Sequence, residues 1–234
     1  MVNFPGKPKY DGNDLRQVVE ILRGENGCPW DRVQTHESLR RNLLEECDEL
    51  CEAIDRADPA LMREELGDVW LQVLFHASIE SQAGLFDLDD VADAECRKLI
   101  SRHPHVFGDA VFADLGEELQ AWEAIKRQEK NQRTPSEAMD AVCRTLPGLW
   151  RAEKLQKKSG EDIPSPEALA GSIREKSGAL SHALETGDRE TGRKVLGQLL
   201  YETVRAARRL ELDPEEALHA VCEEQIRLVR ETEQ

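Results

Sequence analysis

The 234-residue sequence lacks several features that would assign it to common classes of protein. No apolar run approaches the ~20 residues of a membrane-spanning helix, so we do not expect a membrane protein. The first residues, MVNFPGKPKYDGND, lack the apolar segment of a signal peptide, which favours a cytoplasmic location. Lys and Arg number only 31 against 47 Asp and Glu, and the resulting formal charge of −16 argues against nucleic acid as a partner.

The six cysteines do not show the spacing of a structural zinc site or a disulfide framework. No two of them form a CxxC pair, and Cys47 and Cys51 are one turn apart on a predicted helix. We interpret the cysteines as small core residues of a protein in a reducing compartment. Aromatic residues make up only 5% of the chain, and no stretch alternates between apolar and polar residues for long enough to predict a strand.

What the sequence contains instead is a series of helix patterns with clear start signals. Asp58-Pro59 and Ser165-Pro166 each place a capping residue before a proline at the first helical position. Thr134 and Asp213 are followed by proline and then by an acid at the third position, as in a capping box. The predicted helices cover residues 13–24, 36–56, 60–82, 88–103, 115–130, 148–158, 166–185, 189–210 and 214–232. The predicted fold class is therefore all-α.

Acidic residues are concentrated between residues 45 and 68, where ten Asp and Glu face two Arg and the formal charge is −8. At 100° per residue, Glu45, Glu46 and Glu49 fall within one sector of the first predicted helix of this region. Glu65 and Asp68, three residues apart, share one face of the next helix. Two antiparallel helices can therefore present five carboxylates to each other.

Five facing carboxylates repel one another unless a cation lies between them. Mg²⁺ and Mn²⁺ prefer oxygen ligands, so the pattern indicates a divalent metal site. One alternative is a solvated acidic face on two surface helices, since charge runs are commonly solvated. Another is a di-iron site in a helical bundle, which normally requires Glu-x-x-His pairs; neither acidic helix contains such a pair.

The order of these acids is similar to a known family signature. Glu45-Glu46-x-x-Glu49 followed by Glu65-x-x-Asp68 resembles the metal-binding signature of the all-α nucleoside triphosphate pyrophosphohydrolases. Within that superfamily the chain resembles the MazG proteins. The flanking segments are similar as well: ENGCPWD at 25–31, GLFDLDDV at 84–91 and RHPHVFGD at 102–109. The resemblance extends over residues 13–130.

The resemblance implies an enzyme that hydrolyses an NTP or dNTP to the monophosphate and pyrophosphate, with Mg²⁺ or Mn²⁺ as cofactor. The implied metal ligands are Glu45, Glu46, Glu49, Glu65 and Asp68. The first three are also the candidate catalytic residues, with Glu46 or Glu49 accepting the proton of the attacking water. Nucleoside triphosphates are the implied ligands, and the implied assembly is a homodimer.

Three residues outside the acidic region are candidate substrate contacts. Trp30 has a flat indole face that suits a nucleobase, and it can equally lock its loop onto the first helix pair. Lys98 and Arg102 lie one turn apart on the predicted helix 88–103. The resemblance implies that they contact the triphosphate, against the alternative of a solvated basic face.

The second half of the chain has a similar helical pattern but has lost the acids. We predict a first MazG-like repeat at 1–130, a connector at 131–145 and a degenerate second repeat at 146–234. The EExxE positions correspond to Arg174-Glu175-x-x-Gly178, and the ExxD positions to Val195-x-x-Gln198. The second repeat is therefore expected to serve helix packing and a dimer interface, with catalysis in the first repeat.

Two further possibilities follow from the second half. The loss of acids there favours, as an alternative function, a regulatory module that binds Mg²⁺-nucleotide with little turnover. The segment that begins this half is locally basic, with Lys154, Lys157 and Lys158. These lysines can reach a nucleotide in the neighbouring site or form a solvated face.

Overall fold

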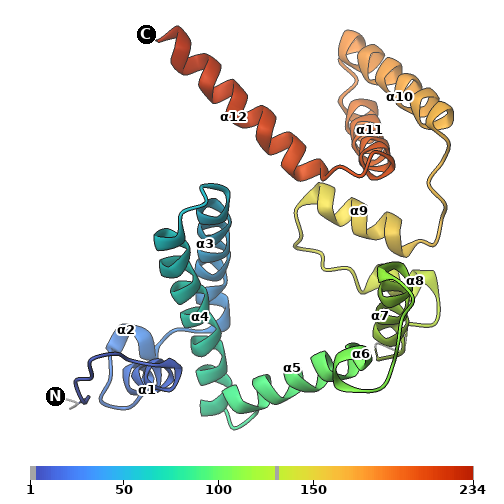
Figure 1. Cartoon of the computed structure of the whole chain (residues 1–234). Coiled ribbons are helices and arrows are strands. Elements are labelled where there is room, and N and C mark those ends of the chain that lie inside the picture. Colours follow the sequence, from blue (N-terminus) through green and yellow to red (C-terminus); the bar gives the residue numbers. More distant parts are fainter. Residues whose placement is uncertain (1–3, 130–131, 234) are drawn as a thin grey trace. The chain divides into compact units, whose positions relative to one another are not determined.

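The computed structural model describes residues 4–129 and 132–233, and within these ranges the chain forms helices and no strand (Figure 1). The all-α prediction is confirmed. The chain divides into two compact units, unit 1 at Met1–Phe112 and unit 2 at Ala113–Gln234. Each helix in the described ranges is too short or too polar to span a lipid bilayer.

Unit 1 contains α1 (Gly12–Arg23), α2 (Pro29–Arg32), α3 (His36–Asp55), α4 (Pro59–Gln82), α5 (Leu88–Arg102) and α6 (Pro104–Phe107). Unit 2 contains α7 (Leu115–Glu129), α8 (Pro135–Asp140), α9 (Gly148–Lys158), α10 (Pro166–Thr186), α11 (Arg189–Arg209) and α12 (Pro214–Thr232). Each predicted helix is present, with ends that agree to within one residue; predicted position 130 lies outside the described residues. The short helices α2, α6 and α8 are additional.

Capping side chains determine where the helices of the acidic hairpin begin. Asp58 Oδ1 accepts hydrogen bonds from the backbone N–H groups of Ala60 at 2.9 Å and Leu61 at 3.2 Å, which starts α4 at the predicted proline. Ala57 adopts the left-handed conformation (φ 49°) and reverses the chain between α3 and α4. The two acidic helices therefore form a tight antiparallel hairpin, as the sequence predicts.

The hydrophobic core of unit 1 lies at the end of this hairpin that is far from the α3–α4 turn. Val19 of α1, Leu39 of α3, and Leu74 and Phe75 of α4 form one buried cluster. Because these side chains are buried together, α1 packs against the hairpin and the alignment of α3 with α4 is fixed. The halves of α3 and α4 nearest the turn carry the acids and are left outside this cluster.

A buried arginine ties α2 to the same end of the hairpin. Arg23 Nη1 donates to the carbonyl of Asp31 at 2.7 Å, and Arg23 Nη2 donates to Gln82 Oε1 at 3.0 Å. Burial lowers the pKa of Arg23, while the charge of Asp31 acts in the opposite direction. Because Gln82 is the last residue of α4, this network holds α2 against the C-terminal end of that helix.

Unit 2 is built around a second hairpin, formed by α10 and α11. Gln156 of α9 is buried, and its Nε2 donates to the carbonyl of Tyr201 in α11 at 2.8 Å. Trp150 Nε1 donates to Asp213, which caps α12, at 2.9 Å. These contacts make α9 the helix that joins the rest of unit 2 together.

The boundary between the units lies at 112–113, so α7 groups with unit 2, whereas the predicted first repeat extends to residue 130. An ion pair between Glu123 of α7 and Lys158 of α9, at 2.7 Å, contributes to this grouping. Each unit contains one long helical hairpin, an arrangement compatible with two repeats. The assignment of repeats at 1–130 and 146–234 stays a prediction.

Candidate metal centre

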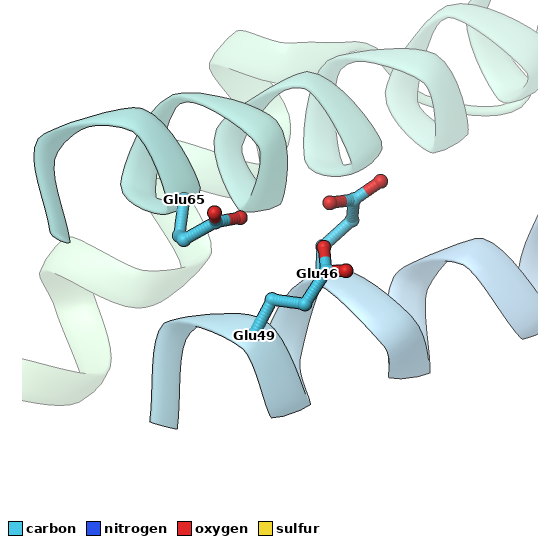
Figure 2. Close-up of side chains that lie close together, drawn as sticks. All are labelled: Glu46, Glu49 and Glu65. Carbon is cyan, nitrogen blue, oxygen red and sulfur yellow. The ribbon is translucent and has the colours of Figure 1, made fainter. Parts of the chain in front are cut away.

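Three of the predicted carboxylates meet between α3 and α4. Glu46 and Glu49 extend from α3 toward Glu65, which extends from α4 (Figure 2). One carboxylate oxygen from each of the three lies within 4.8 Å of the other two. Within residues 4–129 and 132–233, no other three Asp, Glu, His or Cys side chains meet this criterion. The three side chains differ in solvent exposure. Glu65 is buried, with 8% of its surface exposed, Glu46 is half buried and Glu49 is exposed.

The site concentrates negative charge without a compensating cation. Burial raises the pKa of Glu46, and the charges of Asp68, Glu49 and Glu65 raise it further. Burial likewise raises the pKa of Glu65, followed by the charges of Glu49 and Asp68. In the described part of the chain, none of these four carboxylates forms an ion pair with Lys or Arg. The helices therefore hold acids together at an electrostatic cost.

The chemistry of these side chains fits a hard divalent cation. They offer only oxygen donors from two helices, and Mg²⁺ and Mn²⁺ select such donors over nitrogen and sulfur. A bound cation would remove the mutual repulsion that raises the two pKa values. Glu46, Glu49 and Glu65 are the residues that could hold it.

The remaining two predicted ligands lie in different environments. Asp68 is partly buried on α4 and acts electrostatically on Glu46 and Glu65, although it is outside the group of three. Glu45 is exposed and accepts a hydrogen bond from Arg41 Nε, one turn earlier on α3, at 2.9 Å. The structure thus brings three of the five acids together and places Asp68 beside them. The ligand role of all five stays a prediction.

Trp30 is not brought to the carboxylates within unit 1. It lies on α2 with 59% of its surface exposed. The Arg23 network holds α2 at Gln82, whereas Glu65 lies 17 residues earlier on the same helix. At 1.5 Å per residue these two positions are about 25 Å apart along α4. The structure thus places α2 far along α4 from Glu65, and the nucleobase contact of Trp30 stays a prediction.

Lys98 and Arg102 are likewise on a helix that leaves the hairpin at its far end. α5 begins after the turn that follows α4 and extends away from α3 (Figure 1). Lys98 forms an ion pair with Glu95 on the same helix, and Arg102 is the partly buried last residue of α5. Neither residue is in the group of three carboxylates, and the contact of Lys98 and Arg102 with triphosphate stays a prediction.

Comparison with known proteins identifies the family. A family model described as the MazG nucleotide pyrophosphohydrolase domain matches residues 34–107, which include both acidic helices. A Thermotoga maritima protein named nucleoside triphosphate pyrophosphohydrolase/pyrophosphatase MazG is 42% identical over 208 residues, 88% of this chain and 78% of the relative. The chain belongs to the MazG nucleotide pyrophosphohydrolase family. The family resemblance predicted from the acidic signature is thus confirmed.

Further relatives differ in how much of them this MazG-family chain spans. An Escherichia coli protein named nucleoside triphosphate pyrophosphohydrolase is 37% identical over 225 residues, 94% of this chain and 86% of the relative. The Bacillus subtilis protein named uncharacterized protein YabN is 49% identical over 148 residues. That match covers 63% of this chain but only 30% of YabN, so this chain corresponds to a part of the longer protein.

Sequence reasoning missed a histidine pair that aligns the two acidic helices of this MazG-family chain. His36, the first residue of α3, places its Nδ1 atom 2.6 Å from Nδ1 of His76 on α4, and its Nε2 atom 2.6 Å from Glu80 Oε1. The rings are nearly parallel, at 8°, with centroids 4.9 Å apart, which fits a hydrogen bond in the ring plane. Burial, followed by the charge of His36, lowers the pKa of His76. The sequence gives no signal for a pair 40 residues apart.

The raised pKa of Glu65 predicts a pH-dependent difference in stability. In the folded metal-free protein Glu65 keeps its proton at pH values where the unfolded chain has lost it, because its pKa is raised above the ordinary ~4.3. Stability from this group is therefore present at low pH and lost as pH rises through the raised pKa. We expect Glu65→Gln to gain stability relative to wild type as pH rises above about 4.3.

Urea unfolding in EDTA at several pH values measures this difference. Glu20→Gln is the matched control, because Glu20 is an exposed residue of α1 that pairs with Arg16 and does not act on the pKa of Glu65. A stability difference between Glu65→Gln and wild type that does not change with pH would contradict the charge repulsion inferred for the site.

Proposed function

We propose that this protein is a metal-dependent nucleoside triphosphate pyrophosphohydrolase whose active site is the carboxylate group of unit 1. The observation that supports this most directly is the meeting of Glu46, Glu49 and Glu65 within 4.8 Å with no Lys or Arg paired to them in the described residues. The relatives named for pyrophosphohydrolase activity support the reaction. That reaction converts an NTP or dNTP and water to the monophosphate and pyrophosphate.

Mg²⁺ or Mn²⁺ is the proposed cofactor, held by Glu46, Glu49 and Glu65. Asp68 and Glu45 are the additional proposed ligands, Asp68 from beside the group and Glu45 after release from Arg41. When bound, such an ion polarises phosphate oxygens and lowers the pKa of a coordinated water.

The proposed chemistry of the side chains follows from their positions. Glu49 is the exposed member of the group and Glu46 is half buried, so one of these two carboxylates accepts the proton of the attacking water. The water oxygen forms a bond to the α-phosphorus, and the bond from this phosphorus to the bridging oxygen breaks. Pyrophosphate leaves with that oxygen. Glu65 is the most buried of the three carboxylates and serves as a ligand.

Exposed apolar stripes support the proposal of a homodimer. On α5 the apolar stripe of Ala92, Cys96 and Leu99 is exposed, and no residue of this helix is buried. On α12, Leu218 and Val221 are each about half exposed. A helix normally buries such a stripe against a partner. A second copy of the chain is the proposed partner. Its Trp30, Lys98 and Arg102 would then complete the site, because these residues do not join the carboxylates within one chain.

Sedimentation equilibrium tests the dimer. Wild type is expected to sediment as a dimer, and Leu99→Glu or Val221→Glu as a monomer, because a charge cannot be buried in an apolar interface without a partner. Val33→Glu, at an exposed position outside both stripes, is the control. A monomeric wild type would contradict the proposal.

The enzymatic activity is tested by measuring pyrophosphate release from a panel of NTPs and dNTPs with Mg²⁺. We expect Glu49→Ala to lose at least about 100-fold in activity, as expected for loss of a group that stabilises the transition state. Glu175→Ala is the control, because Glu175 is the acid that the second half keeps in the predicted correspondence, where it aligns with Glu46, and it is exposed on α10. Its activity should equal that of wild type.

The contrary outcomes separate the alternatives. If wild type binds Mg²⁺-nucleotide but releases pyrophosphate from none of the substrates, the protein is a binding module and the proposed reaction is wrong. If Glu175→Ala loses activity and Glu49→Ala keeps it, the active site is not in the first repeat.

A further inference from the structure

Unit 2 contains a basic pocket between α7, α8 and α9, with a volume of about 670 Å³. In a chain whose formal charge is −16, the residues that line this pocket carry five positive charges against two negative ones. The basic residues are Lys126, Arg127, Lys154, Lys157 and Lys158, and the acids are Glu123 and Glu153. The pocket is therefore positive where the whole protein is negative.

Both acids of the pocket are already neutralised by lysines. Glu123 pairs with Lys158 at 2.7 Å and with Lys126 at 3.7 Å, and Glu153 pairs with Lys157 at 2.5 Å. Burial raises the pKa of Glu123, but the hydrogen bond and charge of Lys158, together with the charges of Lys126 and Arg127, lower it, and the net shift is downward. The acids thus orient lysines around the pocket and leave its net charge positive.

Two further cations line the pocket outside these pairs. Arg127 of α7 and Lys154 of α9 are exposed, and neither forms an ion pair within the ranges that the structure describes. Lys154 also acts electrostatically on the thiol of Cys143, which lines the same pocket. A hydrogen bond with Thr145 is the main cause of the lowered pKa of Cys143, and Lys154 acts in the same direction.

Apolar side chains also line the pocket. Ala138 of α8 is buried, as is Val142, which lies just after the end of that helix. Both residues line the pocket together with Leu146. The volume lies within the ~300–1,000 Å³ typical of small-molecule sites, which are mostly apolar with a few placed polar groups. A lining that contains both cations and apolar side chains suits a small anion, with or without an attached apolar group.

We propose that this pocket binds a diphosphate or triphosphate, free or carried by a nucleotide, with Arg127 and Lys154 as the principal contacts. The planar guanidinium of Arg127 can bind phosphate oxygens in bidentate fashion, and the ammonium of Lys154 adds a second charge from the opposite helix. The lining offers cations in place of clustered acids, so binding here needs no metal ion. The proposal does not rest on the pyrophosphohydrolase function proposed for unit 1.

Calorimetric titration of the whole protein with inorganic pyrophosphate in EDTA tests the site. Because the chelator removes divalent ions, the proposed metal-dependent site of unit 1 does not contribute. We expect wild type to bind, and Arg127→Ala/Lys154→Ala to bind at least about tenfold more weakly, because two charge-assisted contacts with phosphate are lost. Circular dichroism verifies that the double variant is folded.

Two control variants separate the sites. Lys194→Glu removes a positive charge from an exposed position of α11 outside the pocket, and its affinity for pyrophosphate in EDTA should equal that of wild type. Glu49→Gln should also retain this affinity, whatever its effect on pyrophosphate release. Unchanged binding in the double variant, or no binding by wild type in EDTA, would overturn the proposal.

A parallel titration with ATP in EDTA distinguishes the two sources of phosphate. If ATP binds more tightly than pyrophosphate and the double variant loses this binding, the ligand is a nucleotide. Its base then contacts the apolar residues of the lining. Binding of pyrophosphate as tight as that of ATP or tighter, lost in the same variant, identifies the free anion.

Discussion

Electrostatic repulsion between carboxylates is the constraint on which the account of unit 1 depends. The turn at Ala57 makes α3 and α4 antiparallel, and their packed core fixes the alignment that brings Glu46, Glu49 and Glu65 within 4.8 Å. Burial of Glu65 and Glu46 increases the cost of their charges. Binding of a divalent cation would offset this cost, and in the function that we propose the cation would also attract the polyphosphate of the substrate.

The two units use opposite charges for what we propose are related ligands. Unit 1 places acids between two helices, which in our proposal contact phosphate through a cation, whereas Arg127 and Lys154 of unit 2 are proposed to contact it directly. In the predicted correspondence of the two repeats, Gly178 and Gln198 stand where the first repeat has Glu49 and Asp68, and these residues offer no carboxylate to a cation. A phosphate-binding role by basic residues is compatible with that loss.

Local signals in the sequence were sufficient for the fold but not for the whole site. Proline and capping residues such as Asp58 predicted helix ends to within one residue, and helical spacing alone placed Glu46 and Glu49 on one face opposite Glu65. Arg41 and Glu45 lie four residues apart on α3, a spacing that favours an ion pair, so the exposed pair of Glu45 could have been predicted beside its ligand role. The His36–His76 contact and the distance of α2 from the acids depend on tertiary packing, which leaves no periodic signal.

Titration with Mn²⁺ measures whether the carboxylates of α3 and α4 hold a divalent cation. Electron paramagnetic resonance follows the titration, because free Mn²⁺ gives the signal. The account predicts that wild type removes Mn²⁺ from the free pool and that Glu46→Gln/Glu49→Gln/Glu65→Gln does not, while Glu175→Gln binds as wild type does. Equal binding of Mn²⁺ by wild type and the triple variant would contradict the account.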